Sequence, residues 1–228
     1  MKQDDTSRET ILRRIREQIG RSPDGDARAR ERVHAHLASL EPNIVPARGQ
    51  GNDEHRQRVF TERAQSVQAE VQRVRSWADI PPAVSAWLRL HNLPQKLVMA
   101  PDARLGEAGW NSQPLLRVRS GAAEDEDVNG LTIAESGVAE TGTLCLASAP
   151  ERPTLLAWLP ENSIVALPSS RIVPAYEDAL RLYSEEHDSP PRSINFITGP
   201  SRTGDIGQKL ELGAHGPRRL LILIIDEA

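Results

Sequence analysis

The sequence predicts an α/β fold, in which a mostly parallel sheet is covered on both of its faces. Segments typical of strands alternate with segments typical of helices over much of the 228 residues. The last of these segments, RLLILIID at residues 219–226, is apolar at almost every position. A strand of that kind is stable only where both faces of its sheet are buried. In such sheets, ligands bind at the carboxyl ends of the strands.

The N-terminal residues predict an amphipathic helix. TSRETILRRIREQIG, at residues 6–20, has Thr6 and Glu9 in capping-box spacing and Gly20 as its end. Four apolar residues form one stripe along it: Ile11, Leu12, Ile15 and Ile19. Such a stripe needs a partner, so we expect it to pack on its own domain or on a second copy of the chain in a homodimer.

The next segment predicts an arm between the helix and the main domain. Residues 21–51 mix charges with proline and glycine, a pattern typical of an extended linker with a short helical piece over residues 29–40. We therefore assign residues 1–51 to an N-terminal helix and extended arm, and residues 52–228 to the main domain.

Helices and strands alternate within the main domain. Phe60, Ala64, Val67 and Val71 have the spacing of a helix face, although EVQRVRS at residues 70–76 could already be a strand. Further helices are predicted after Asp79, with two prolines in the first turn, and over residues 174–186. Strands are predicted at KLVMAP (96–101), LLRVR (115–119), LTIAES (131–136), TLCLAS (143–148), LLAWL (155–159), SIVALP (163–168), SINFIT (193–198) and residues 219–226.

Charge and cysteine content exclude several classes of function. The formal net charge of −4 gives no reason to expect a nucleic acid as partner, because phosphate neutralisation needs concentrated lysine and arginine. Cys145 is the sole cysteine, so the chain cannot ligate an iron–sulfur cluster or build a cysteine zinc site by itself. No signal peptide and no apolar run of membrane-spanning length are seen, which predicts a cytoplasmic protein without a membrane span.

The loop after SINFIT has the composition of an anion site. Gly199 lets a ligand approach the main chain, and Ser201 and Thr203 supply neutral hydrogen-bond donors. Arg202 adds a planar fork that matches a carboxylate or a phosphate. We therefore predict that this loop binds a small anion at the end of its strand.

The same loop holds two candidates for acid or base chemistry. Asp205 could cap a turn, hold Arg202 in place or contact a ligand hydroxyl. His215, in the tight turn GAHGP that ends with Gly216 and Pro217, could titrate near neutral pH or simply bond to the main chain. We count Gly216 with the predicted anion-binding residues.

A second polar turn lies between two predicted strands, in ESGVAETGTLCLAS at residues 135–148. It presents the Glu140 carboxylate, the hydroxyls of Thr141 and Thr143, and the glycine Gly142. Such a turn is also typical of a plain hairpin, but two polar turns in one α/β chain favour a shared crevice. Glu140, Asp205 and His215 are therefore the candidate catalytic residues. The sequence shows no metal site and no flavin or dinucleotide glycine fingerprint, so the cofactor stays open.

These segments resemble a known family. GVAETGTLCLAS, RPTLLAWLPENSIVAL and ITGPSRTGDIGQKLELGAHGP, in that order, are similar to the LUD domain of the lactate utilization protein C (LutC) family. The resemblance implies a Rossmann-like three-layer fold related to the sugar-phosphate isomerase and coenzyme A transferase-like superfamily. It also implies a role in oxidising L-lactate to pyruvate beside iron–sulfur partner proteins. It supplies a pathway but no catalytic mechanism.

Three hypotheses follow for the function. The first is a non-iron–sulfur component of an L-lactate utilization system with an anion-binding crevice. The second is an independent transferase-like or ligase-like enzyme, in which Glu140 attacks an acyl-coenzyme A or acts as acid and base on a phosphorylated substrate. The third is a regulator that senses a ligand without chemistry.

Overall fold

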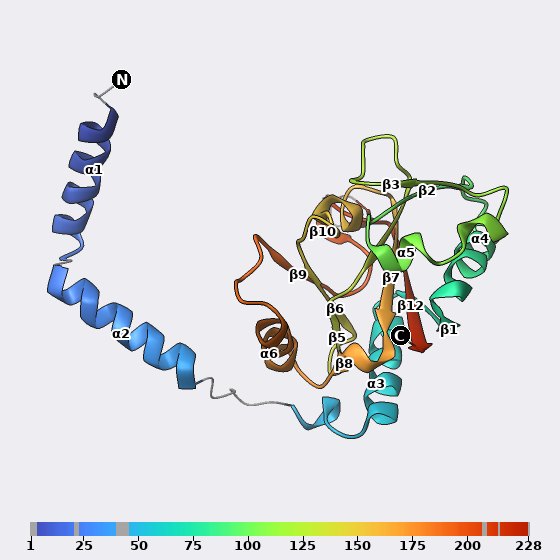
Figure 1. Ribbon diagram of the computed structural model, residues 1–228, viewed down its shortest axis with the longest axis horizontal. Helices are drawn as coiled ribbons and strands as arrows, with labels where there is room; N and C mark the ends of the chain where they lie inside the picture. Colours follow the sequence, from blue (N-terminus) through green and yellow to red (C-terminus); the bar gives the residue numbers. More distant parts are fainter. Residues whose placement is uncertain (1–3, 21–22, 40–45, 207–208, 214, 228) are drawn as a thin grey trace. The chain divides into compact units, whose positions relative to one another are not determined.

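The computed structural model describes residues 4–20, 23–39, 46–206, 209–213 and 215–227. The chain divides into two compact units, residues 1–44 and 45–228 (Figure 1). In the described part of the chain, the helices are too short or too polar to cross a membrane.

The first unit consists of two helices, α1 (Asp4–Gln18) and α2 (Pro23–Ser39). The predicted N-terminal helix is therefore present, and its isoleucines Ile11, Ile15 and Ile19 are exposed within the described residues. The second helix begins six residues before the predicted helical piece, which was too short. Proline at the first helical position and acidic residues in the first turn both suit a helix N-terminus.

The second unit is built on a six-stranded parallel sheet with the strand order β1-β12-β7-β4-β2-β3. The strands are β1 (Glu70–Ser76), β2 (Lys96–Met99), β3 (Arg117–Ser120), β4 (Asn129–Ile133), β7 (Asn162–Pro168) and β12 (Arg219–Glu227). The predicted α/β class is confirmed. Residues 70–76 form a strand, and the preceding helix, α3 (Asp53–Ser66), ends before them.

Strand β12 explains why both faces of this sheet are covered. Its alternate residues Leu221, Leu223 and Ile225 pack in one core cluster with Val84, Trp87 and Leu88 of α4 (Ile80–Leu90). The residues between them, Leu220, Ile222 and Ile224, pack in a second cluster with Phe60 and Ala64 of α3. The apolar run therefore reflects burial on both faces, as predicted.

A separate four-stranded sheet contributes to the second cluster. Its order is β8-β5-β6-β9, and it is antiparallel except for the β5–β8 pair. The strands are β5 (Ser136–Val138), β6 (Thr143–Ala147), β8 (Ile172–Val173) and β9 (Ile194–Ile197), and α6 (Tyr176–Glu186) packs on β5. Figure 1 shows these elements on the opposite side of β7 from α4. SINFIT thus belongs to this sheet, and the loop after it does not follow a strand of the parallel sheet.

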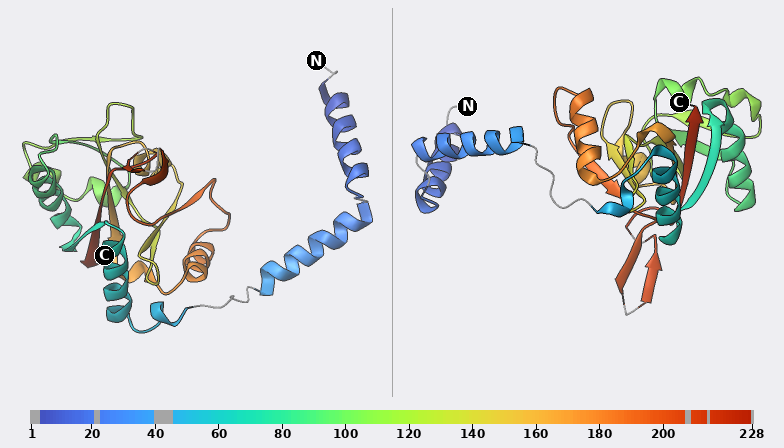
Figure 2. Two further views of the ribbon diagram at one scale, coloured as in Figure 1. Left: turned by 180° about the vertical axis from the view of Figure 1, so that it is seen from behind. Right: turned by 90° about the horizontal axis from the view of Figure 1, so that it is seen from below.

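Further predicted elements differ from the structure. The loop after SINFIT contains a hairpin of β10 (Arg202–Ile206) and β11 (Lys209–Leu212), which extends away from the rest of the second unit (Figure 2). LLAWL is a 3₁₀ turn, η4 (Thr154–Ala157), rather than a strand, and it follows Pro153, which cannot donate a ladder hydrogen bond. The remaining short helical segments are η1 (Ala47–Gly49), η2 (Trp77–Asp79), α5 (Ala103–Gly106), η3 (Trp110–Ser112) and η5 (Ser169–Arg171).

Two glycines let the four-stranded sheet approach α3. Gly142 and Gly199 have φ of 68° and 74°, in the left-handed region that favours glycine. A Cβ on Gly142 would lie 2.3 Å from the main-chain nitrogen of Ala64, and one on Gly199 would lie 2.5 Å from the carbonyl oxygen of Val67. Both positions therefore require glycine for close packing as well as for the turn.

We predict that Gly142→Ala lowers the free energy of unfolding by about 2–4 kcal/mol, because the left-handed conformation and the contact with α3 both oppose a methyl group. Urea denaturation measures this change. Gly109→Ala is the matched control, since Gly109 has φ of 82° with open space around its Cβ position. It should lose only about 1 kcal/mol. Equal losses in the two variants would contradict the packing role of Gly142.

Candidate functional site

Three neighbouring strands of the parallel sheet end in charged residues. Asp102 and Arg104 follow β2, Glu135 follows β4, and Arg171 follows β7. From β2 the chain continues to β3 at one edge of the sheet, whereas from β4 it continues towards β7 on the other side. The gap between β2 and β4 is therefore a topological switch point, where α/β sheets form their ligand crevice.

A cavity of about 310 Å³ lies at this point. Its lining is mostly charged and comes from the ends of β2, β4 and β7, the loop after β6 and the end of α6: Arg104, Ala134, Glu135, Arg152, Pro168, Arg171, Glu186 and His187. This volume is at the lower end of the range of roughly 300–1,000 Å³ for small-molecule sites. The cavity therefore suits a small polar ligand.

Glu135 is the buried centre of the charged lining. Its side chain is 4% exposed and forms ion pairs with Arg152 and with Arg171, the latter at 2.7 Å. Arg171 also donates from Nε to the main-chain oxygen of Glu135 at 2.8 Å. Arg171 also donates hydrogen bonds to both carboxylate oxygens of Glu186. One carboxylate thus holds two guanidinium groups, and a second carboxylate shares one of them.

A further ion pair forms the β2 side of the cavity. Arg104 donates from Nε and a terminal nitrogen to the two carboxylate oxygens of Asp102, at 2.9 and 2.7 Å. Burial raises the pKa of the Asp102 carboxyl, but the hydrogen bonds and charge of Arg104 outweigh it and hold the pKa below its ordinary value. The hydrogen bond from Arg171 likewise lowers the pKa of Glu186. Both carboxylates are therefore ionised at neutral pH.

Two side chains of the lining, those of Arg152 and His187, are candidates for contact with a ligand. The Nε of Arg152 is buried without a hydrogen-bond partner among the described residues. His187 stacks on Tyr183, and its Nδ1 lies 3.0 Å from the main-chain oxygen of that residue. Because a carbonyl oxygen only accepts, Nδ1 donates in this contact and Nε2 is the ring nitrogen left to meet a ligand. The Nε of Arg152 is shielded from solvent, so a ligand in the cavity reaches it only if this side chain moves.

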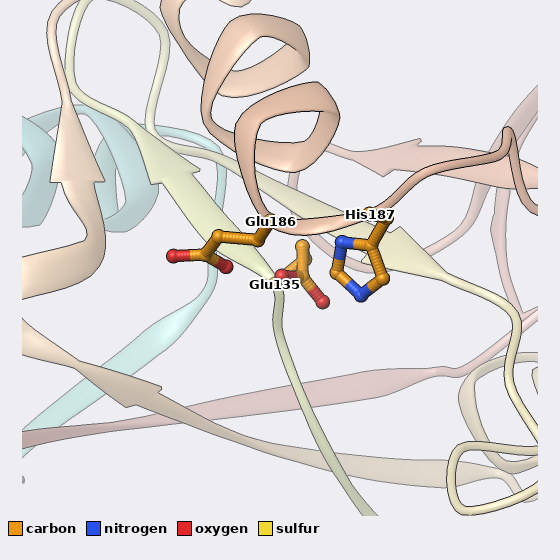
Figure 3. Close-up of side chains that lie close together, drawn as sticks. All are labelled: Glu135, Glu186 and His187. Carbon is orange, nitrogen blue, oxygen red and sulfur yellow. The ribbon is translucent and has the colours of Figure 1, made fainter.

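Figure 3 shows Glu135, Glu186 and His187 close together, as in a metal site. Their potential ligand atoms all lie within 4.8 Å of one another. Each carboxylate, however, already accepts hydrogen bonds from arginine. A divalent cation would have to displace a guanidinium group and would face Arg152 and Arg171 at close range. The arrangement therefore disfavours a divalent cation.

The two polar turns predicted from sequence do meet, in a hydroxyl cluster outside the cavity lining. Thr143 is hydrogen-bonded to Thr141 at 2.7 Å, to Tyr176 at 3.0 Å and to Thr198 at 2.6 Å. Thr198 precedes Gly199, so this cluster joins the turn at Gly142 to the loop after β9. These hydroxyls satisfy one another, and anion binding by Thr141, Gly142 and Thr143 stays a prediction.

The other predicted anion-binding residues lie around the start of β10. Arg202 donates to the main-chain oxygen of Val67 at 2.7 Å, at the end of α3. Ser201 bonds through its main chain to Pro217 and Gly213, and Gly216 packs beside its side chain. Thr203 is half-buried on β10. Anion binding by these residues stays a prediction.

The three candidate catalytic residues are not brought together by contacts of the described residues. Glu140 is 6% exposed, lies against Gly49 and Pro174, and has a buried Oε2 without a hydrogen-bond partner in the described part of the chain. His215 is exposed. Asp205 belongs to β10, and its side chain lies outside the described residues. Their catalytic roles stay predictions.

Sequence reasoning missed Glu135, Arg152 and Arg171, although a signal for two of them was present. LTIAES and SIVALPSSR each end an apolar run with a charged residue, as does KLVMAPD. The carboxyl ends of parallel strands meet at one edge, so these charged residues could have been grouped. Arg152 carries no such signal, because it lies in the loop that follows β6 of the smaller sheet.

The six-stranded parallel sheet, with helices on both faces and a charged cavity at its switch point, defines an α/β protein. The family model described as LUD domain matches residues 57–225. The chain belongs to the LUD domain family, and the predicted family resemblance is confirmed.

Several proteins named lactate utilization protein C are similar to this chain. That of Geobacillus thermodenitrificans is 36% identical over 121 residues, which cover 52% of this chain and 50% of the relative. That of Anoxybacillus flavithermus is 35% identical over 106 residues, covering 46% and 47%. The chain thus spans about half the length of the curated relatives it matches.

A solved structure shows the same fold. The crystal structure of a DUF162 family protein from Deinococcus radiodurans matches with a TM-score of 0.57 and 19% sequence identity. The match covers 77% of this chain and 99% of the other. At this identity, the likeness concerns the fold alone.

We predict that Asp102→Asn lowers the free energy of unfolding by about 1–3 kcal/mol near pH 7, because Arg104 loses a charged acceptor. The pKa of Asp102 is lowered in the folded state, so its stabilisation is present above pH 4 and is lost as the pH falls through the folded pKa. The difference between wild type and variant should therefore shrink below about pH 4. Urea denaturation across pH 3–7 measures it.

Asparagine can still accept the main-chain hydrogen bond at the start of α5, so the comparison isolates the charge. Asp125→Asn, at an exposed aspartate, should change little at any pH. A difference between Asp102→Asn and wild type that stays constant down to pH 3 would contradict the lowered pKa.

Proposed function

We propose that the chain is the non-iron–sulfur component of an L-lactate utilization system, which oxidises L-lactate to pyruvate, and that it binds a small anion in the switch-point cavity. Membership of the LUD domain family and similarity to proteins named lactate utilization protein C support the pathway. The observation that carries the site is the arrangement of three guanidinium groups around a cavity of about 310 Å³. Guanidinium groups match the planar geometry of a carboxylate.

The electrons of this oxidation require an acceptor outside the chain. Conversion of L-lactate to pyruvate releases two electrons and two protons, and Cys145 is the only cysteine in the sequence. Burial raises the pKa of the Cys145 thiol to about 11, so it is protonated at neutral pH. Cluster ligation needs several thiolates. We therefore propose iron–sulfur partner proteins as the electron acceptors.

The cavity residues suggest a division of roles. Arg152 and Arg171 would hold the anion, and Glu135 would position both guanidinium groups. His187 would accept a proton from a ligand hydroxyl at Nε2. The charged side chains of the lining would fix the orientation of the ligand.

The turn at Ser201–Thr203 is a second candidate for the anion. It has the donors predicted from sequence, but Arg202 already donates to Val67. The cavity is favoured because three guanidinium groups, from three segments of the chain, line one space. We also propose that the fold is Rossmann-like and related to the sugar-phosphate isomerase and coenzyme A transferase-like superfamily.

One observation favours an alternative function. The Oε2 of Glu140 is buried without a hydrogen-bond partner among the described residues, which is costly unless the group has a task. In a transferase-like enzyme, this carboxylate would attack an acyl-coenzyme A. Gly49 and Pro174 cover Glu140, so this alternative needs them to move.

The test is lactate-dependent dye reduction in an anaerobic extract that lacks this chain. We expect added wild-type protein to restore activity and Arg152→Met to restore at most about one tenth of it, since loss of a desolvated charged contact costs about 2–5 kcal/mol. Arg181→Met, at a surface arginine on α6, is the matched control and should restore full activity.

Two further proteins separate the possible sites. Arg152→Lys keeps the positive charge but loses the planar guanidinium group. Circular dichroism shows whether each variant is folded. Loss of activity in Arg202→Met, with Arg152→Met fully active, would move the anion to the Ser201–Thr203 turn. Full activity without any added protein would contradict the proposed function and favour the Glu140 alternative.

A further inference from the structure

The charges around the cavity are balanced before any ligand binds. Arg104, Arg152 and Arg171 contribute three positive charges, and their partners Asp102, Glu135 and Glu186 contribute three negative charges. His187 is the remaining titratable group in the described lining. An anion added to this set would bring a negative charge without a free cation to match it. Tight binding of an anion therefore requires one carboxylate to leave.

Glu186 is the carboxylate best able to leave. The side chains of Asp102 and Glu135 are 11% and 4% exposed, whereas that of Glu186 is 42% exposed. Glu135 is held by two arginines and cannot move without breaking both ion pairs. Glu186 is the last residue of α6 and is paired with Arg171 alone among the described residues. A small rotation of its side chain into solvent would free one side of the Arg171 guanidinium.

The geometry of this pair identifies the ligand that would replace it. The two terminal nitrogens of Arg171 donate to the two carboxylate oxygens of Glu186, one to each. This is the bidentate arrangement that fits a planar carboxylate. One negative charge leaves with Glu186, so a ligand with one negative charge restores the balance. Phosphate, which carries between one and two charges near neutral pH, would exceed it.

We propose that a small monocarboxylate binds in the cavity by replacing the Glu186 carboxylate on Arg171. Glu186 is then a built-in competitor that sets the affinity of the site and selects singly charged ligands. Arg152 lines the same cavity, and a rotation of its side chain would let the buried Nε, which lacks a partner among the described residues, donate to a second ligand oxygen beside the carboxylate. This inference rests on the proposed small-anion function of the cavity.

The test compares the binding of L-lactate and of inorganic phosphate to the full chain by isothermal titration calorimetry at pH 7.5. In wild type, only the molecules with Glu186 displaced can bind. The apparent Kd therefore equals the intrinsic Kd divided by the fraction of such molecules. Glu186→Gln removes the competing charge. We expect it to bind L-lactate on the order of tenfold more tightly than wild type, with a smaller gain for phosphate.

Glu185→Gln is the matched control, because it removes the same charge from the neighbouring position of α6. Glu185 lies 4.0 Å from Arg181 and is not part of the cavity lining among the described residues. It should bind L-lactate like wild type. Arg171→Gln should abolish L-lactate binding, and circular dichroism checks that it is folded.

An unchanged Kd in Glu186→Gln would overturn the proposal, as would an equal gain in Glu185→Gln, which would show a general charge effect. Wild-type binding by Arg171→Gln, or no L-lactate binding by any of the proteins, would also overturn it. The dye-reduction experiment tests the proposed function separately. If Arg152→Met abolishes dye reduction while Glu186→Gln leaves the Kd unchanged, the function stands and the competitor role fails. If Glu186→Gln binds L-lactate more tightly but dye reduction does not need the chain, the competitor role stands and the proposed function fails.

Discussion

Burial of the Glu135 carboxylate between two guanidinium groups is the interaction on which the rest of the cavity depends. Removing a carboxylate from water costs several kcal/mol unless a cation and hydrogen bonds compensate it. Arg152 and Arg171 provide this compensation, from the loop after β6 and from the end of β7. Since Glu135 follows β4, one buried charge joins three segments at the switch point. Because Glu135 holds Arg171 in place, the terminal nitrogens of Arg171 are positioned to bind Glu186, the carboxylate that we propose a ligand replaces.

The motifs that identify the family are largely explained by packing. Gly142 and Gly199 let the four-stranded sheet approach the backbone of α3, and Thr143 connects the neighbouring strands through its hydroxyl cluster. Arg202 donates to Val67 at the end of the same helix. The contacts of Gly142, Gly199 and Arg202 are thus with α3 and the residue that ends it, and none of these three residues lines the cavity. Both the family motifs and the cavity lining lie within the residues matched by the family model, and Arg152 belongs to both.

The sequence could predict those elements whose local residue pattern shows which of their faces are buried. The apolar run of β12 requires burial on both faces, and the structure places its alternate residues in two core clusters. The smaller sheet could not be predicted, because its strands are as short and apolar as the parallel ones, and nothing local specifies their partners. LLAWL is equally apolar, yet Leu155 and Trp158 are exposed on a turn. For the site, Glu135 and Arg171 are 36 residues apart, so only the strand order brings them together.

The most direct test of the cavity as an anion site is a crystal structure of the chain grown with L-lactate. The account predicts electron density for lactate beside Arg152 and Arg171, with its carboxylate on the Arg171 guanidinium and the Glu186 side chain turned into solvent. Lactate bound at the Ser201–Thr203 turn, with the Arg171–Glu186 pair intact, would contradict the account.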